Sequence, residues 1–339
     1  MELKTILRDL CAKSGVNGCA QAADFARELL SQYTTDVHSD VMGNVVGVIP
    51  CHIENAPTVL LEAHIDEVGF VVTHVDEKGF LRVAECGGAD NRALSSAPVT
   101  VLSDPPMDGV FAMAPVHLAK EDTPLPKLAE RVIDIGKQNT QNIAVGTRVV
   151  FRSHFEELCN GRVCAKALDN RAGVVAVLRT LELLKGQSLP VNVAVLFCTQ
   201  EELGLRGAKT AAFAVRPDAA LVVDVSFAHT PDADENRCGI LGNGVMIGMS
   251  PVLNRGMTDA LHTLAQKHTI ACQWEVMGEM TGTDADVTSV TADGIRTALL
   301  SVPLRYMHTP TEVIALSDVE ATAQLMAVYI REGEVPTHA

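Results

Sequence analysis

The sequence is poor in aromatic and basic residues. Only 4% of its 339 residues are aromatic, with a single Trp, which argues against a glycosidase, since such an enzyme needs a carboxylate pair in an aromatic-lined sugar groove. Lys and Arg number 27 against 42 Asp and Glu, for a formal net charge of −15. Binding to phosphates needs a concentrated positive patch. We therefore expect neither nucleic acid nor an anionic membrane surface as a partner.

The chain also lacks long apolar runs. Stretches such as 194–197 and 298–302 are far shorter than the ~18 residues that a membrane-spanning helix needs. Near the N-terminus, Glu2, Arg8 and Asp9 interrupt any apolar segment of the kind found in a signal peptide. We expect a cytoplasmic protein without a membrane partner.

The cysteine pattern excludes a disulfide framework or a zinc finger. There are nine Cys, an odd number, and they are scattered without a CxxC pair, which favours reduced thiols. Any metal site must therefore be built from His and carboxylate side chains.

Helical and strand patterns divide the chain into an α/β domain and an inserted β-rich module. Residues 1–33 show the apolar spacing of helices, and short apolar runs within 44–72 predict buried strands. Short alternating strands separated by Gly, Pro and Asp fill 71–164, and beyond them helices alternate with buried strands. We expect an α/β domain from residues 1–70 and 165–339, interrupted by a β-rich domain at 71–164.

Polar residues that suit metal binding follow the buried runs. In open α/β sheets, ligands bind at the carboxyl ends of the strands. The residues at such positions are His64 and Asp66 after VLLEA, Glu201 and Glu202 after AVLFCTQ, Asp224 after LVV, and His308 after ALLSVPLRYM. Asp169 lies at the start of a helix predicted near Arg171, where the helix N-terminus favours a carboxylate. The shared location of these residues predicts one site.

Each residue alone has an ordinary structural explanation. The His64–Asp66 pair could be a surface His bonded to a carboxylate, and the adjacent Glu pair could be a solvated helix start. Asp224 is more informative, because its apolar neighbours imply burial, and a buried carboxylate must be paired or bound to metal.

The set suits divalent metal ions. Two imidazoles with three of these carboxylates favour Zn²⁺ or a similar ion such as Co²⁺ over a calcium cage or a thiolate site. One carboxylate can bridge two ions ~3.5–4 Å apart, and a water between them would ionise near neutral pH. Glu201 and Glu202 point in different directions as neighbours at a strand end, so that one can bind metal while the other moves protons.

Six longer strings carry a family resemblance. They are AHIDEVGF at 63–70, KALDNRAG at 166–173, TQEELGLRGA at 199–208, VVDVSF at 222–227, TGTDAD at 281–286 and RYMHTPTEV at 305–313. Through these strings, which span most of the chain, it resembles the tetrahedral (TET) family of dimetal aminopeptidases. That family includes glutamyl and deblocking aminopeptidases and members mislabelled as endoglucanases.

The resemblance implies the ligands of two metal ions. One ion would be held by His64, Asp169 and Asp224. The other would share Asp169 and be held also by Glu202 and His308.

The resemblance also implies the remaining roles and the activity. Glu201 would be the general base, and Asp66 would orient His64, a role that the HxD spacing supports. The expected reaction is hydrolysis of the N-terminal residue of short peptides through a metal-bridging hydroxide. The substrate-binding residues are unknown, and we expect an acidic or aliphatic N-terminal residue.

Further expectations from the resemblance concern fold and assembly. It implies a three-layer zinc-peptidase-like domain with a mixed central sheet and a PDZ-like inserted domain. It also implies a homo-oligomer, a dodecamer that could form through dimers. His117 resembles part of a loop that the inserted domain sends to a neighbouring subunit, and an exposed loop His explains it equally well.

Two other functions remain open at this point. An N-acyl amino acid deacylase or a carboxypeptidase would use the same kind of dimetal centre. A scaffold protein could have inherited the fold without the chemistry, but the presence of all five ligands and the general base argues against it.

Overall fold

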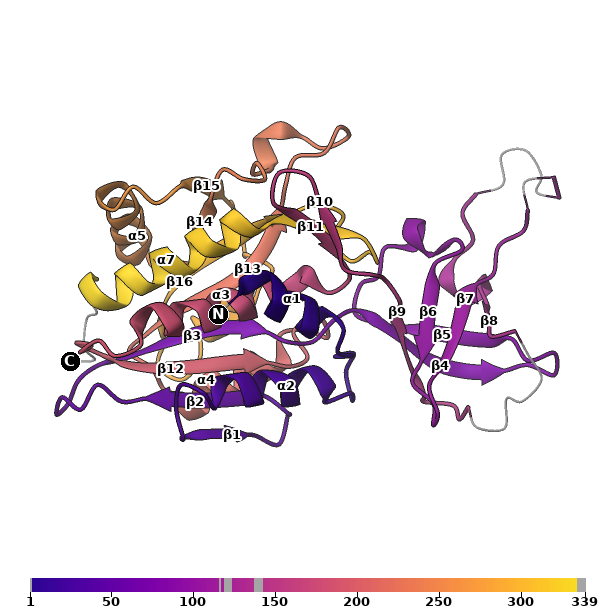
Figure 1. The fold of residues 1–339 in the computed structure, drawn as a ribbon, viewed down its shortest axis with the longest axis horizontal. Coiled ribbons are helices and arrows are strands. Elements are labelled where there is room, and N and C mark those ends of the chain that lie inside the picture. The colour runs from indigo at the N-terminus through magenta and orange to yellow at the C-terminus, as the bar shows by residue number, and fades with distance from the viewer. Residues whose placement is uncertain (1, 116, 119–123, 137–142, 334–339) are drawn as a thin grey trace.

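The computed structural model describes residues 2–115, 117–118, 124–136 and 143–333. Within them the chain forms an eight-stranded sheet flanked by helices, a closed six-stranded barrel and a three-stranded sheet. Figure 1 shows the barrel as a separate body beside the large sheet. The predicted α/β class is confirmed.

The eight-stranded sheet is mixed, as predicted. Its central strands β12, β3, β13 and β16 run parallel, and β2 and β14 run antiparallel to their central neighbours. The central strands are almost wholly buried, which explains their continuous apolar runs. In spatial order the strands are β1 (Val37–Ser39), β2 (Val45–Ile49), β12 (Asn192–Cys198), β3 (Thr58–His64), β13 (Ala219–Phe227), β16 (Arg296–Leu304), β14 (Val245–Met249) and β15 (Cys272–Val276).

Helices pack on both faces of this sheet. The main hydrophobic core joins one face to a group of helices that includes the two expected in residues 1–33. These helices are α1 (Leu3–Cys11), α2 (Gln21–Leu30), α3 (Leu168–Leu184), α5 (Arg255–Lys267) and α7 (Leu316–Glu332). Figure 1 shows α3 and α7 crossing the sheet. Smaller apolar clusters join the opposite face to α4 (Arg206–Val215) and α6 (Ala285–Thr288).

The barrel has its own apolar core. Phe70 contacts Phe111 and Phe151 edge to face, with ring centroids 5.0 Å and 5.5 Å apart. Around the barrel the strands are β4 (Gly69–Val75), β5 (Leu81–Cys86), β8 (Ile133–Asp134), β7 (Met107–Phe111), β6 (Pro98–Val101) and β9 (Arg148–Phe151). Its connections contain the short helices η1 (Asn91–Leu94) and η2 (Leu128–Glu130).

The barrel is shorter than the expected insert of 71–164. Its strands lie within 69–151, whereas β10 (Glu156–Leu158) and β11 (Arg162–Ala165) form the three-stranded sheet with β17 (Glu312–Ala315). The division into two domains and the PDZ-like character of the insert stay predictions.

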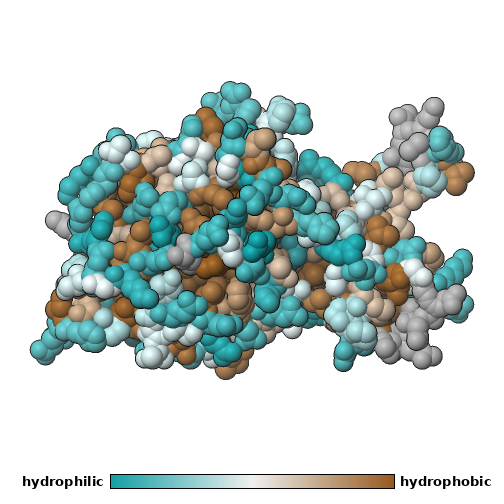
Figure 2. Space-filling view, in the orientation of Figure 1, coloured by the Kyte–Doolittle hydropathy of each residue, from teal (hydrophilic) through white to brown (hydrophobic). Residues whose placement is uncertain are grey.

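The surface mixes polar and apolar residues. Figure 2 shows hydrophilic and hydrophobic groups interspersed on the face in view. Among the described residues, no helix has the length and apolarity needed to cross a membrane.

Candidate metal centre

The fold brings all seven predicted site residues to one edge of the central sheet. Carboxyl ends of parallel strands meet at the same edge, and the connections that follow them carry the polar groups. His64 ends β3 and Asp66 follows it, Asp169 lies at the start of α3, Glu201 and Glu202 lie between β12 and α4, Asp224 lies in β13, and His308 lies between β16 and β17.

Asp169 lies between the two imidazoles. Its Oδ1 is 3.0 Å from Nε2 of His64, and its Oδ2 is 3.3 Å from Nε2 of His308. Asp224 Oδ1 is 3.6 Å from Nε2 of His64, and Glu202 Oε1 is 3.4 Å from Nε2 of His308. These distances place Asp169 where a carboxylate shared by two ions would have to be.

Asn170 fixes the start of α3 and so the position of Asp169. Its Oδ1 accepts a hydrogen bond of 2.9 Å from the backbone N–H of Gly173, as an N-cap residue does. Its Nδ2 donates to the carbonyl of Val223 in β13 at 2.8 Å. Asp169 and Asn170 have non-helical φ/ψ angles, so the regular helix begins at Arg171, where the sequence predicts it.

Asp66 supports both His64 and the turn that carries the two glutamates. Its Oδ1 lies 3.6 Å from Nδ1 of His64. Its two oxygens also accept hydrogen bonds from the backbone N–H groups of Glu201 at 3.2 Å and Glu202 at 3.3 Å. The sequence suggests the contact with His64, but it gives no sign of the contacts with the turn.

The two glutamates diverge from this turn. Glu201 Oε2 lies 4.0 Å from Nε2 of His64, whereas Glu202 approaches His308. Neighbouring residues therefore reach different parts of the site, which two different roles require.

The barrel contributes to the site through the loop after β5. The carbonyl of Gly88 lies 2.8 Å from Nδ1 of His308, and the N–H of Asp90 donates to the His308 carbonyl at 3.0 Å. Gly87 has a φ of +86°, and a Cβ there would lie 3.1 Å from Cβ of Glu202. This loop therefore holds His308 with Nε2 turned toward the carboxylates, and its close approach favours glycine.

Sequence reasoning missed Glu312. This buried carboxylate accepts hydrogen bonds from the backbone N–H groups of Asp169 at 3.1 Å and His308 at 2.9 Å. It ties together two segments that both supply site residues. A Glu at the start of the apolar run EVIA, four residues after His308, is the available signal.

A second group that the sequence did not reveal lies beside the site. Glu62 accepts hydrogen bonds from the Cys198 thiol at 3.2 Å and from Thr288 at 3.0 Å. Asp284, 1% exposed, has no hydrogen-bond partner for either carboxylate oxygen within the described part of the chain. Burial raises the pKa of Glu62 to about 7 and that of Asp284 well above its usual value. The ligand atoms of Glu62, Cys198 and Asp284 all lie within 4.8 Å of one another.

The site concentrates buried negative charge. Burial raises the pKa of Glu201 to about 9, with His64 opposing the shift and Asp224 adding to it. Burial and the nearby Asp169 raise the pKa of Glu202 well above its usual value. Carboxylates brought this close repel one another, and cations between them would relieve the repulsion.

The donor set fits divalent ions. Among the described residues, three groups of side chains have ligand atoms within 4.8 Å of one another, and two of them lie in this site: His64, Glu201 and Asp224, and His64, Asp169 and Glu202. Imidazole nitrogen with carboxylate oxygen suits Zn²⁺ or Co²⁺. Glu201 lies close enough to be a ligand itself, so geometry alone does not separate its role from that of Glu202.

Comparison with known proteins places this chain in a family. The family described as M42 glutamyl aminopeptidase matches residues 43–325. A lysyl aminopeptidase from Pyrococcus furiosus is 29% identical over 96% of both chains. The aminopeptidase APDkam598 from Desulfurococcus kamchatkensis has a similar structure, with a TM-score of 0.92, 31% identity, and coverage of 98% of this chain and 95% of that one.

A third similar protein is the TET1 peptidase of Pyrococcus horikoshii, which can assemble into a tetrahedron or a large octahedral shell. Its TM-score is 0.84 at 29% identity, covering 98% of this chain and 100% of that chain. Since the family match spans well over half of the sequence and the folds agree, the chain belongs to the M42 glutamyl aminopeptidase family of peptidases.

Proposed function

We propose that this protein is a metal-dependent aminopeptidase that removes the N-terminal residue of short peptides. The observation that carries the proposal is Asp169, whose two oxygens face His64 and His308 separately while further carboxylates surround them. Beside the shared Asp169, His64 has Asp224 as a carboxylate partner and His308 has Glu202. A buried group of this kind suits two cations better than one.

In this proposal one ion would be held by His64, Asp169 and Asp224, and the other by Asp169, Glu202 and His308. Bound ions of this type supply Lewis acidity at the scissile carbonyl. Side-chain exposure is 29% for His308 and 2% for His64, so a substrate approaches from the His308 side.

Glu201 is the proton carrier of the proposed reaction. It accepts a proton from the attacking water and delivers it to the leaving amine, as a general base and then a general acid. Burial raises the pKa of Glu201 to about 9, and cations beside it would lower this pKa toward the range in which a carboxylate can accept and release a proton. Asp66 holds the backbone of this residue in place.

Aminoacyl substrates with a free or an acetylated α-amine test the proposed function. The metal-replenished protein should cleave leucyl-aminomethylcoumarin and leave its N-acetyl form intact, since an aminopeptidase requires the free amine. Cleavage of N-acyl amino acids instead would identify a deacylase, and release of C-terminal residues a carboxypeptidase.

Asp66→Asn should weaken metal binding or turnover by ~10–100-fold, the usual effect of removing a carboxylate that supports a ligating His. Asp66 accepts one backbone N–H bond on each oxygen, from Glu201 and from Glu202. Asn has only one oxygen, and its amide nitrogen cannot accept the other bond. Chelator competition and kcat, measured with and without excess metal, give the size of both effects.

Asp76→Asn is the matched control for that variant. Asp76 also accepts two backbone N–H bonds, from Lys78 and Phe80, but it does so in the β4–β5 turn of the barrel. Equal losses in the two variants would show that Asp66 acts only on folding.

We further propose that the chain forms a homo-oligomer larger than a dimer. The assembly of the similar TET1 peptidase into closed shells supports this proposal. Sedimentation with Zn²⁺ or Co²⁺ should show a large species, and chelation should shift it to smaller ones if metal binds only the assembled state. A fully active monomer would contradict the proposal.

A further inference from the structure

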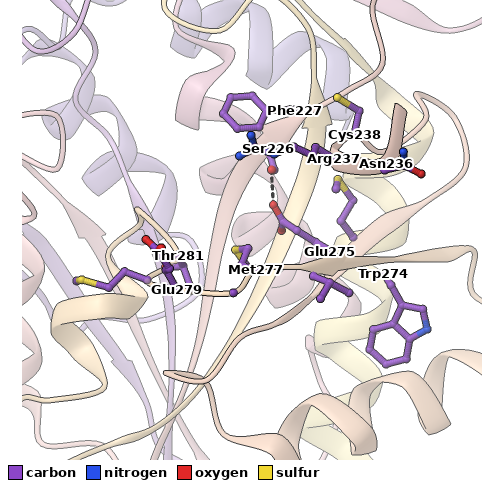
Figure 3. A pocket seen from close by; sticks show the side chains of 14 residues that line it. Ser226, Phe227, Asn236, Arg237, Cys238, Trp274, Glu275, Met277, Glu279 and Thr281 are labelled. Atoms are coloured by element: carbon purple, nitrogen blue, oxygen red, sulfur yellow. Dashed lines mark hydrogen bonds between the residues drawn. The ribbon is translucent and has the colours of Figure 1, made fainter. Parts of the chain in front are cut away.

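A pocket of about 510 Å³ is lined by residues of β13, β14 and β15 and of the loop that follows β15 (Figure 3). Its lining combines polar residues such as Ser226 and Thr281 with the apolar side chains of Met246 and Met277. The volume is within the range of small-molecule sites. Such a pocket can accommodate a long side chain, with its apolar lining residues contacting the methylene groups of that side chain.

Glu275 lies in this pocket and has only neutral partners in the described part of the chain. Its Oε1 accepts a short hydrogen bond from the Ser226 hydroxyl, drawn in Figure 3, and its Oε2 accepts one of 2.6 Å from Ser301. Burial raises the pKa of Glu275, and the charge of Asp224 adds to the shift. A carboxylate in this setting gains stability from any cation that reaches it.

The pocket is close to the proposed metal ligand Asp224. Ser226 follows Asp224 by two residues in β13, so both side chains project from the same face of the sheet, about 7 Å apart along the strand. Ser301 is the register partner of Asp224 on β16. A substrate whose scissile bond lies at Asp224 can therefore extend its first side chain toward Glu275.

We propose that this pocket receives the side chain of the first residue of the substrate and that Glu275 selects a basic one, Lys or Arg. The inference rests on the proposed aminopeptidase function and names its substrate class. The ammonium or guanidinium group bonds to the Glu275 carboxylate, and the aliphatic stem contacts Met246 and Met277. This preference for a basic first residue differs from the acidic or aliphatic preference expected from the sequence.

The other charged groups of the pocket do not reverse this preference. Arg237 and Glu279 both line the pocket and are both exposed. Exposed charges are screened by water and salt. Glu275 is partly buried, so water and salt screen its charge less than they screen Arg237 and Glu279. Its charge therefore decides which substrate side chain is preferred.

The test compares hydrolysis of lysyl, norleucyl, leucyl and glutamyl aminomethylcoumarins by the metal-replenished full-length protein. Norleucine keeps a four-carbon stem without the ammonium group. The wild type should have its highest kcat/KM on the lysyl substrate. Glu275→Gln should lower that value by about 10–100-fold, the range of a charge-assisted hydrogen bond, and change the norleucyl value less than about twofold.

Glu279→Gln is the matched control, because it removes a carboxylate from the same pocket at an exposed position. It should change lysyl kcat/KM less than about twofold. An equal fall on lysyl and norleucyl substrates in Glu275→Gln, or a wild type that does not prefer lysine, overturns the inference and leaves the proposed function standing. No hydrolysis of any of the four substrates overturns both.

Discussion

Replacing Glu201 by Gln should lower kcat by about 10²–10⁴-fold while both metal ions stay bound. The amide keeps the size of the side chain but cannot take a proton from water. Because Asp66 holds the backbone of Glu201 and the other carboxylates surround the ions, neither the fold nor the ion-binding groups should change. KM should change little, since the lost interaction belongs to the transition state. Steady-state kinetics with metal analysis on the same sample measures both quantities.

Glu202→Gln is the control for that result, because it changes the neighbouring carboxylate in the same turn. Glu202 approaches His308 and is proposed to hold an ion, so this variant should bind about one ion fewer, and excess metal should restore part of its activity. If Glu201→Gln loses metal while Glu202→Gln keeps both ions and loses only turnover, the two roles are reversed.

Replacing Glu67 by Gln should lower the free energy of unfolding by about 3–5 kcal/mol, because it removes the anion from a buried group of charges. Glu67 Oε2 lies 2.6 Å from Nζ of Lys166, and Glu67 Oε1 lies 3.8 Å from Arg171, which is fully buried. The same Oε1 accepts the N–H of Gly15 at 2.8 Å. Urea unfolding at fixed protein and metal concentrations measures the loss.

Two further variants test the reason for that loss. Asp259→Asn removes the carboxylate of an exposed pair with Arg255 and should leave the free energy of unfolding nearly unchanged. In the Glu67→Gln variant, Lys166 and Arg171 remain buried without the Glu67 carboxylate. Adding Lys166→Met removes one of these cations and should recover part of the lost free energy of unfolding. Equal losses for Glu67→Gln and Asp259→Asn, or no recovery in the double variant, would contradict the account.

The central sheet and the location of the site could be predicted because both depend on local pattern. Buried parallel strands such as β12 and β13 are continuous apolar runs, so their ends are visible in the sequence. Polar residues at those ends must meet at one edge of the sheet. His64 and Glu201 are 137 residues apart, and Asp169 and His308 are 139 apart, yet this rule brings them together.

The second edge of the sheet could not be predicted in this way. Strands β14 and β15 are five residues each, and β15 is only partly buried, with Trp274 and Val276 exposed at 41% and 73%. Short half-exposed strands have no continuous apolar run, and their position depends on the neighbour with which they pair. The pocket around Glu275 lies in this region, and for that reason no substrate-binding residue could be predicted from the sequence.

The supporting carboxylates also escape sequence reasoning. Glu312 and Glu67 bond to backbone N–H groups and buried cations of distant segments, and neither contact leaves a local pattern. The boundary of the β-rich insert is hidden for the same reason, because the alternation in β10 and β11 resembles that of the barrel strands. Only the pairing of β11 with β17 assigns them to another sheet.

Titration of the metal-free protein with Zn²⁺ or Co²⁺, followed by hydrolysis of an aminoacyl substrate and of its N-acetyl form, tests the central claim most directly. Activity on the free-amine substrate should rise as two ions bind per chain, and the acetylated form should remain uncleaved. Full activity in protein shown to be free of metal, or equal cleavage of both substrates, would contradict a dimetal aminopeptidase.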